Sequence, residues 1–539
     1  MKQITFFYKL GLLLLVTQMA SANPTAFIAC GNKVCESQSN ENSINCPMDC
    51  DPGVVTSYNY ETVCTKDSVI YRPENLSDLQ GILAEVSKSS NPHLRFLGSR
   101  HSISSLVCGK GNSVLVENFN RIIGVGVDSS GQNYVEVEAG VKLGDLSDFL
   151  HQKGYSLGFA FPAYHGLTMA GLFATGAHGS SRVYPGISSQ TILEMTVLSA
   201  DGKKHLIGSK NPRLLKAFKV HLGLLGFVHS IKLKIEPQFN LEMRTTMLEN
   251  ENQYFQEGQP VNLGSSCDSE SIAWFPYINK AVKFCGTKTT EAADPTAASV
   301  LLGSDQRPSA TESLEKIIQA FGGKTEAAML KAEELRFAGF ANTPPYVVLD
   351  QGGKEQYLNR VVGPSHKILI SKPMSTFRLY KNDDISFAFP LSELTAVSET
   401  IRRFVVDRKL GLPIIGVFLR FAKSDGGSYL SHIEGGKSGQ VFVLGEFATY
   451  KYFNVSPDDA VGLEQKKMLE EKINSLVGEL VLKHSVKFHW GKNTNQIFTQ
   501  ANVQKNYGKN LQEFKKIRKQ FDPHGMFSNE LLDSLFQLK

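Results

Sequence analysis

The amino-acid sequence predicts a chain of the α+β class with more than one domain, and three observations lead to this expectation. At 539 residues the chain is too long for one ordinary hydrophobic core. From about Thr65 onward, short runs with the alternation of β-strands are mixed with segments whose apolar residues recur at helical intervals. Between Cys30 and Cys50, polar residues and cysteines leave almost nothing to join such a core, so a separate small module is expected there.

The composition is that of a soluble globular protein and does not predict a polyanionic partner. The chain has 57 basic and 52 acidic residues, a formal net charge of +5, and no long block of one sign. A nucleic-acid-binding surface usually shows as a cluster of basic residues. We therefore expect no nucleic-acid partner.

The N-terminus predicts export. Lys2 and Lys9 precede the apolar run Leu10–Val16, and Ala20–Ala22 (ASA) has the small residues of a signal-peptidase site, so residues 1–22 are predicted to be a signal peptide. A membrane anchor is the alternative, but the run is shorter than the roughly 20 residues that span a bilayer, and no other segment reaches that length. The mature chain is expected to be secreted or periplasmic, without a membrane span.

The cysteines agree with export. All eight follow the leader, and an even number in an exported chain favours disulfides. Four lie within residues 30–50, so residues 23–62 are predicted to be a disulfide module. Cys64 with Cys108 and Cys267 with Cys285 are plausible further pairs. Calcium held by Glu36, Asp49 and Asp51 is an alternative for the module, but their spacing is not that of a calcium loop, and thiolate-bound zinc competes poorly with disulfide formation. No metal site is predicted.

The elements of the first half can be assigned in order. NYVEVEAGVKL, residues 133–143, alternates apolar residues with glutamates at positions 136 and 138, which predicts a strand with the glutamates in solvent. LGDLSDFLHQKG, residues 143–154, has apolar residues at helical intervals and ends at a glycine, which predicts a helix. TILEMTVLSADGKKHLIG, residues 191–208, has Asp201–Gly202 between two strand-like runs and predicts a hairpin.

The second half is less regular. Ser230–Pro237 alternates again and predicts a strand. Residues 287–325 are rich in Ala, Thr, Ser and Gly, which indicates an insertion or long surface excursion within a second α+β region. Near the C-terminus, Leu511–Phe521 predicts a basic helix, closed by Pro523 and Gly525.

Two loops are candidates for ligand binding. In LRFLGSRHSISSLVCGKG, residues 94–111, a strand-like run breaks at Gly98 into a polar loop that contains Arg100 and His101. HGLTMAGLFATGAHGSS, residues 165–181, has so little side-chain bulk that a flat or phosphorylated ligand could lie close to the backbone amides, although tight packing of the backbone would explain it equally well. The usual nucleotide, hydrolase and metalloprotease motifs are absent from the sequence.

Four motifs in this order resemble those of a known family. GSRHS after a strand, TMAGLFATGAHGSS, HWGKN and FDPHGMFSNELL are similar to the vanillyl-alcohol-oxidase (PCMH-type) FAD flavoproteins, in the aldonolactone and alditol oxidase branch. Plant-type L-gulonolactone oxidases and bacterial alditol oxidases are the nearest types. The resemblance extends from about Val63 to the C-terminus. It implies a two-domain α+β fold, with an FAD-binding domain and an antiparallel-sheet substrate domain.

The resemblance also implies how FAD is held. In many members the histidine of the first loop is bonded to the 8α carbon of the flavin, and here that histidine is His101; a neutral imidazole suits this chemistry. The alternative is a histidine that only forms hydrogen bonds, as in relatives that hold FAD without a covalent bond. The residues expected to contact the cofactor are Gly98, Ser99, Arg100, His101, Ser102, Thr168, Gly171, Thr175, Gly176, His178, Gly179, Gly226 and Val228.

Three further residues match catalytic positions of the family. Lys492 in HWGK matches its active-site lysine, and Arg420 in VFLRFAKSD matches the arginine of an E-x-R motif. Phe418 stands where that motif has its glutamate, which puts a simple alditol substrate in doubt. Glu446, near another polar position of the family, could compensate. A cation beside a carbinol oxygen stabilises the charge that develops as hydride leaves carbon, and a second group can accept the proton.

The resemblance implies an exported FAD-dependent oxidoreductase that oxidises a CH–OH group of a sugar lactone or polyol, with dioxygen as acceptor and hydrogen peroxide as product. A dehydrogenase on the same scaffold with a cytochrome or quinone acceptor is the nearest alternative, and a secreted carbohydrate-binding protein with a decayed flavin site is another. The domain boundaries expected beyond the module are an FAD-binding domain at 63–240, a substrate domain at 241–480, and a C-terminal segment at 481–539 that completes the FAD domain and active site.

Overall fold

The computed structural model describes residues 55–58, 62–64, 69–255, 267–302, 306, 326–371, 382–412, 415–424, 426–433, 438–450, 460–493 and 495–538. All of them belong to one compact unit, Gly53–Lys539. Three predicted features lie wholly or partly outside the described residues: the signal peptide, the four cysteines of residues 30–50, and the part of the 287–325 excursion that follows residue 302, apart from residue 306. The expectations for them stay predictions.

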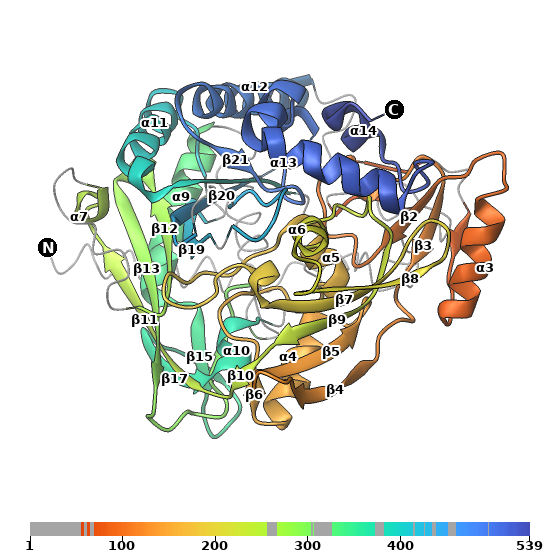
Figure 1. The fold of residues 1–539 in the computed structure, drawn as a ribbon. Coiled ribbons are helices and arrows are strands. Elements are labelled where there is room, and N and C mark those ends of the chain that lie inside the picture. Colours follow the sequence, from red (N-terminus) through yellow and green to blue (C-terminus); the bar gives the residue numbers. More distant parts are fainter. Residues whose placement is uncertain are drawn as a thin grey trace, which may run out of the picture. The chain divides into compact units, whose positions relative to one another are not determined.

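The first half of the unit begins with a small parallel sheet. Its strands are β1 (Ile70–Tyr71), β3 (Asn112–Leu115) and β2 (Leu94–Leu97), in that order across the sheet. Helix α3 (Leu76–Val86) buries an apolar stripe of Leu79, Leu83 and Val86, and it begins at Asn75, whose side chain accepts a hydrogen bond from a first-turn amide. In Figure 1 these elements are the orange group on the right. Strand β2 ends directly before Gly98, so the sheet positions the loop that begins at Gly98 in the interior of the unit.

A five-stranded antiparallel sheet follows, in the order β4 (Ile122–Val127), β5 (Asn133–Glu138), β9 (Phe227–Lys234), β7 (Ile192–Leu198) and β8 (Lys204–Gly208). Strand β5 and helix α4 (Leu143–Gln152) lie where the periodicity predicts them, and β7 and β8 form the predicted hairpin.

One expectation for β5 was wrong. Glu138 is only 2% exposed instead of facing solvent. Its carboxylate accepts hydrogen bonds from the backbone amide and the guanidinium of Arg121, which offsets the cost of burying the charge. Glu136, by contrast, remains partly exposed.

The second half is built on an eight-stranded sheet of antiparallel neighbours. The strand order is β17 (Arg360–Pro364), β11 (Asn240–Leu248), β13 (Lys280–Thr289), β12 (Ser269–Phe275), β19 (Val417–Lys423), β20 (Val441–Tyr450), β18 (Asn382–Pro390) and β21 (Lys487–Phe488). Fully buried aromatic side chains, among them Trp274, Phe387 and Phe447, form its core. A disulfide joins Cys267 to Cys285 on β13, and a second joins Cys64 to Cys108, so both suggested pairs are present.

Helices cover this sheet and return the chain to the first half. Figure 1 shows α11 (Leu394–Asp407), α12 (Ala460–Lys483) and α13 (Gln500–Phe521) along one side of the unit. After α13 the chain bonds to the first half, where the Phe521 carbonyl accepts from the Ala200 amide and the Met526 carbonyl accepts from the Leu94 amide. Helix α14 (Glu530–Phe536) ends the described chain. The C-terminal residues therefore contact the same strand, β2, that leads into the Gly98 loop.

Helix α13 is longer than the sequence predicts. It begins at Gln500 instead of Leu511, because Thr499 caps it by accepting a hydrogen bond from the Asn502 amide. A kink at Gly508, with φ of 31°, interrupts the helical pattern between the two halves. The remaining described elements are α5 (Met169–Thr175), α6 (Pro212–Phe218), α7 (Asn252–Phe255), α9 (Glu326–Asn342), α10 (Ser365–Leu369), β6 (Tyr155–Ser156), β10 (Glu236–Pro237), β14 (Ala298–Ser299), β15 (Tyr346–Leu349) and β16 (Glu355–Tyr357). Within the described part of the chain, no helix is long and apolar enough to cross a membrane.

Candidate active site

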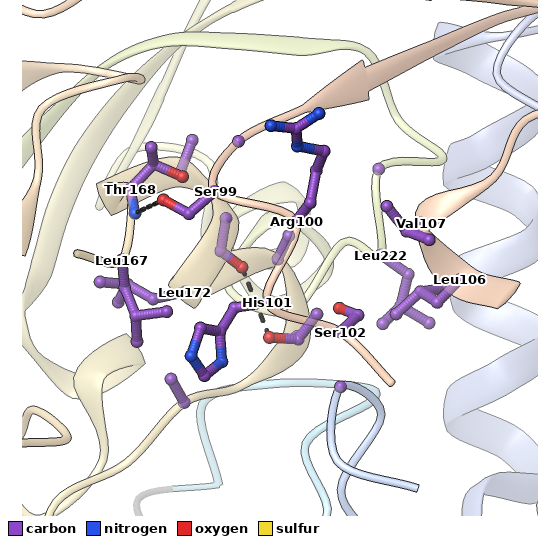
Figure 2. A pocket seen from close by; sticks show the side chains of 18 of the residues that line it. Ser99, Arg100, His101, Ser102, Leu106, Val107, Leu167, Thr168, Leu172 and Leu222 are labelled. Atoms are coloured by element: carbon purple, nitrogen blue, oxygen red, sulfur yellow. Dashed lines mark hydrogen bonds between the residues drawn. The ribbon is translucent and has the colours of Figure 1, made fainter. Parts of the chain in front are cut away.

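The residues of both predicted ligand loops line one cavity of about 1260 Å³, a volume that includes its part open to solvent (Figure 2). Segments from both halves of the unit contribute to its wall, which is a common place for ligand pockets. Of the residues expected to bind a ligand or act in catalysis, those that line it are Gly98, Ser99, Arg100, His101, Ser102, Thr168, Gly171, Thr175, His178, Gly226, Val228, Arg420, Glu446 and Lys492.

Gly176 and Gly179 are outside the lining, and the structure gives them another role. Gly176 ends helix α5 with φ of 78°, a conformation that favours glycine. A Cβ on Gly179 would lie 2.0 Å from the carbonyl oxygen of Phe159. Both glycines serve the packing of the chain behind the cavity.

The Gly98 loop and the start of helix α5 are in direct contact. Ser99 Oγ accepts a hydrogen bond from the Thr168 amide at 3.1 Å and donates to the Gly166 carbonyl, as Figure 2 shows for the first of these bonds. A Cβ on Gly98 would lie 2.0 Å from Thr168 Oγ1. Arg100 has φ of 55°, a left-handed conformation that is uncommon for a residue with a side chain. The loop is thus held in one strained shape against α5.

The side chain of His101 contacts two aromatic rings. The ring of Tyr58 stacks on the imidazole, with centroids 4.0 Å apart and an angle of 30° between the planes. Tyr164 lies on the cavity side, 5.0 Å away at 59°. In Figure 2 the imidazole stands apart from the Ser99–Thr168 contact, below the loop backbone.

Two buried donors in the cavity wall were not expected from the sequence. Arg95 on β2 donates from Nη2 to the Leu106 carbonyl at 2.7 Å, but its Nε and Nη1 have no hydrogen-bond partner among the described residues. His221 accepts the Gly223 amide at Nδ1, so its Nε2 carries the proton, and this atom likewise has no described partner. Burial lowers the pKa of Arg95 to about 10 and that of His221 to about 3.

These groups point to a ligand with many acceptor atoms. A buried donor without a partner is costly, so groups of this kind usually meet a ligand or water. Arg95 also keeps a positive charge at neutral pH, which suits an anion. The one signal in the sequence was a charged residue inside the apolar run LRFL.

Opposite the loops lies a largely buried network of two cations and two carboxylates. Lys492 Nζ is 2.6 Å from Asp384 Oδ2 and 3.4 Å from Glu446 Oε1. Arg420 Nη2 is 2.6 Å from Glu446 Oε2. Glu446 therefore bridges the two cations, and the four charges sum to zero.

Strand register explains the position of Glu446. On β19, Phe418 stands two residues before Arg420, and the residue directly opposite Phe418 on β20 is Glu446. The carboxylate that the E-x-R motif would place on β19 is thus supplied from the neighbouring strand. Asp384, on β18, was missed; the signal was an acidic pair at the start of the apolar run ISFAFP.

The network fixes the protonation states at the site. Burial opposes the charge of Lys492, but Asp384 and Glu446 outweigh it and raise the pKa of Lys492 well above its ordinary value. Burial likewise opposes the charge of Glu446, but Lys492 and Arg420 lower its pKa. At neutral pH both groups are charged. Tyr164, whose ring centroid is 4.9 Å from Lys492 Nζ, has its pKa raised by burial and remains a phenol.

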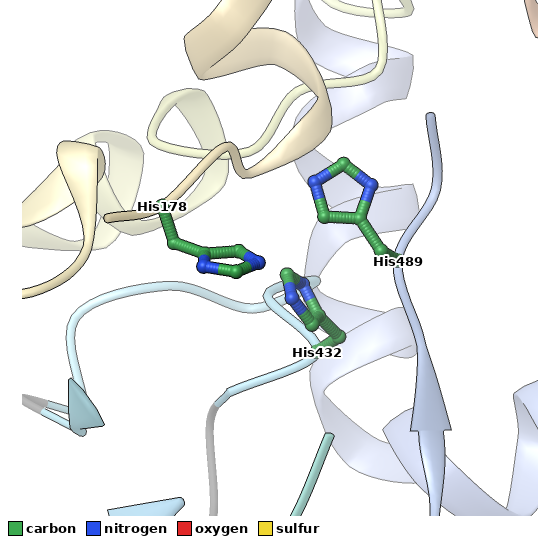
Figure 3. A group of neighbouring side chains, drawn as sticks. All are labelled: His178, His432 and His489. Atoms are coloured by element: carbon green, nitrogen blue, oxygen red, sulfur yellow. The ribbon is translucent and has the colours of Figure 1, made fainter. Parts of the chain in front are cut away.

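Three histidines meet behind this network (Figure 3). Nitrogen atoms of His178, His432 and His489 lie within 4.8 Å of one another, and all three side chains are buried. Burial lowers the pKa of each, so the rings are neutral. Such a trio can hold a metal, but His489 accepts the Gly491 amide at Nδ1, and its proton is therefore on Nε2. That ring is a donor here instead of a ligand.

Comparison with known families finds two matches. A family described as an FAD binding domain matches residues 68–207, and a family described as D-arabinono-1,4-lactone oxidase matches residues 231–535. The second match covers more than half of the chain.

Similar proteins and structures agree with these matches. "Probable L-gulonolactone oxidase 6" and "L-gulonolactone oxidase 3" of Arabidopsis thaliana are 24% and 25% identical to this chain, covering 89% and 91% of it and 80% and 86% of the relatives. The solved structure of a solvent-stable cholesterol oxidase covers 90% of this chain and 97% of its own, with a TM-score of 0.69 and 17% identity. At that identity the structural likeness concerns the fold alone.

Proposed function

Because the chain belongs to the D-arabinono-1,4-lactone oxidase family, we propose that it is an FAD-dependent enzyme that oxidises a CH–OH group of a sugar lactone or polyol, with dioxygen as acceptor. The observation that carries the proposal is a charge network in which Lys492, Arg420 and Glu446 line the same cavity as the two glycine loops. Asp384 holds Lys492 from outside the lining. Sugar lactones and polyols offer the hydroxyl groups that such a network can bind.

The lining suits FAD. The free donors of Arg95 and His221 match a cofactor with a pyrophosphate and a ribose. The Gly98 loop, with its half-buried polar residues, and the small residues at the start of α5 allow a ligand to approach the backbone closely. Bound there, FAD supplies a hydride acceptor.

The side chains of this chain have separable tasks. Lys492, held by Asp384, places a positive charge where the carbinol oxygen becomes negative as hydride leaves the carbon. Arg420 orients Glu446, and the ionised Glu446 is positioned to accept the hydroxyl proton. Tyr164 can donate a hydrogen bond to a substrate oxygen.

Two finer features belong to the proposal. His101 is proposed to carry the flavin covalently, supported by its place in the cavity wall and by the family resemblance of GSRHS. Export of the mature chain, from the leader at residues 1–22, is likewise proposed; the two disulfides support it because such bonds persist outside the cytoplasm.

The first test is whether the flavin stays bound to the protein after denaturation. The purified protein is denatured with acid, and we expect the flavin spectrum in the pellet for the wild type and in the supernatant for His101→Ala. His524→Ala, on an exposed residue, is the control. Flavin released from the wild type would contradict the covalent link. A protein that stays colourless after addition of FAD would contradict the enzyme and favour a binding protein.

The second test concerns substrate and acceptor. With L-gulono-1,4-lactone, D-arabinono-1,4-lactone or a series of alditols, we expect oxygen uptake and an equal yield of hydrogen peroxide. Bleaching of the flavin by substrate without oxygen uptake would instead identify a dehydrogenase that uses another acceptor.

Gly98→Ala is expected to abolish or strongly reduce FAD binding. The new methyl group would overlap Thr168 Oγ1, so the loop and helix α5 must separate and the lining must change shape. Measured as flavin per protein, the loss should not occur in the control Gly81→Ala, where a Cβ would meet no atom within 4 Å. The double variant Gly98→Ala/Thr168→Ser should still fail to bind FAD, because the serine keeps the Oγ atom that the new methyl group meets. The double variant Gly98→Ala/Thr168→Ala removes that atom and should recover part of the FAD binding.

A further inference from the structure

We propose that Tyr58 is a positioning residue for His101, and that the Cys64–Cys108 disulfide holds it there so that the histidine can be joined to the flavin. The inference rests on the proposed covalent FAD. It concerns residues 55–58 and 62–64, which we call together the Tyr58 segment.

The Tyr58 segment is fixed to the cavity loop by several bonds. The Tyr58 amide donates to the Ser102 carbonyl at 2.8 Å, directly after His101 in the chain. Thr56 and Val63 form a β-bridge, and the Cys64 amide donates to the Val55 carbonyl at 2.8 Å. The two ends of the segment are therefore paired, and its middle is bonded to the loop.

A small apolar cluster and the disulfide secure this arrangement. Val55 and Cys64 pack with Leu97, Val107 and Leu115, which belong to β2, β3 and the stretch between them. Cys64 is bonded to Cys108, which follows the Gly98 loop by a few residues. The disulfide thus closes a ring of residues 64–108 that contains His101. Tyr58 lies outside this ring, six residues before Cys64, and is tied to it by the hydrogen bond between the Cys64 amide and the Val55 carbonyl.

The geometry at His101 gives this arrangement its function. The rings of Tyr58 and His101 are stacked at 4.0 Å, whereas His101 lines the cavity and Tyr58 does not. Tyr58 is 8% exposed. It therefore supports the imidazole without occupying ligand space, and together with the contact of Tyr164 it restricts the imidazole to a narrow range of orientations.

A restricted imidazole suits the attachment reaction. Attachment forms a bond between an imidazole nitrogen of His101 and the 8-methyl carbon of the flavin. One hydrogen leaves that carbon and one leaves the nitrogen, both as protons, while dioxygen takes the two electrons and becomes hydrogen peroxide. A nucleophile fixed near its target reacts faster than one that samples many rotamers.

The test follows covalent attachment after FAD is added to protein produced without it. The fraction of flavin in the acid pellet is measured over time, with total flavin binding measured on the native protein. Tyr58→Phe keeps the stacked ring and should match the wild type. Tyr58→Leu should attach flavin roughly tenfold more slowly, because His101 is no longer held, while still binding FAD.

The cysteines provide a matched comparison. Cys64→Ser/Cys108→Ser should slow attachment as Tyr58→Leu does, and Cys267→Ser/Cys285→Ser, which removes the disulfide at β13, should not. If Tyr58→Leu does not fold, this comparison decides alone. Equal attachment rates in the two cysteine variants would overturn the inference and leave the proposed function intact. A yellow wild-type protein that releases all its flavin into acid would overturn the inference and the covalent bond, but not the FAD enzyme.

Discussion

Lys492→Met is expected to lower kcat by about 10²- to 10³-fold, the usual cost of removing a group that stabilises developing charge. Lys492 is the cation that the network fixes most firmly, since Asp384 and Glu446 both contact it and keep it protonated. The rate of flavin reduction by substrate in a stopped-flow experiment measures the effect directly. Lys423→Met, an exposed lysine on the same strand as Arg420, is the control.

Loss of Lys492 also leaves two carboxylates with one cation, so stability must be separated from catalysis. Removing one partner of a buried ion pair typically costs about 3–5 kcal/mol. The double variant Lys492→Met/Asp384→Leu removes both members of the pair that Lys492 forms at 2.6 Å, and it should recover most of the stability but none of the rate. Recovery of the rate as well would mean that Lys492 acts only through folding.

Acid is expected to destabilise the protein steeply below pH 6.5. Four fully buried histidines, His178, His221, His432 and His489, have lowered pKa values, first of all because burial disfavours the charged ring. Below pH 6.5 the unfolded chain binds protons that the folded chain does not, so stability falls as the pH falls. Each histidine lowers the free energy of unfolding by about 1.4 kcal/mol for every pH unit below 6.5, so the four together lower it by about 5–6 kcal/mol per pH unit. For His221 and His489 this continues down to their folded pKa of about 3.

Urea unfolding at pH 7.5, 6.0 and 5.0 checks this slope. Glu333 acts in the opposite sense, because burial raises its pKa to about 7 and it gains a proton on folding. Burial raises the pKa of Glu251, Glu270 and Asp522 as well, whereas His229 and His484, whose pKa values are lowered, act in the same sense as the four histidines. His432→Phe should reduce the slope by about one quarter, whereas His524→Gln, on an exposed residue, should not change it. An unchanged slope in His432→Phe would show that this ring can become charged within the fold.

Much of the fold could be predicted because its signals are local. The alternation of β5, the helical spacing of α4 and the Asp201–Gly202 turn each lie within about a dozen residues, and the structure has all three. Errors occurred where a distant partner decides. Glu138 is buried because Arg121, on the neighbouring part of the sheet, pairs with it. The early start of α13 is different, because its signal, the cap of Thr499 on the Asn502 amide, is local and the sequence prediction did not use it.

The sequence by itself determined the pieces: two glycine-rich loops, a histidine after a strand break, and a lysine in HWGK. Only the tertiary structure decided which groups meet. Glu446 joins Arg420 and Lys492 because strand register sets it opposite Phe418. Tyr58 stacks on His101, 43 residues away in the sequence, beside a disulfide that joins Cys64 to Cys108. Arg95 and His221 became visible only as buried donors without partners. Contacts of this kind depend on pairing between remote segments and on burial, which the order of residues along the chain does not express.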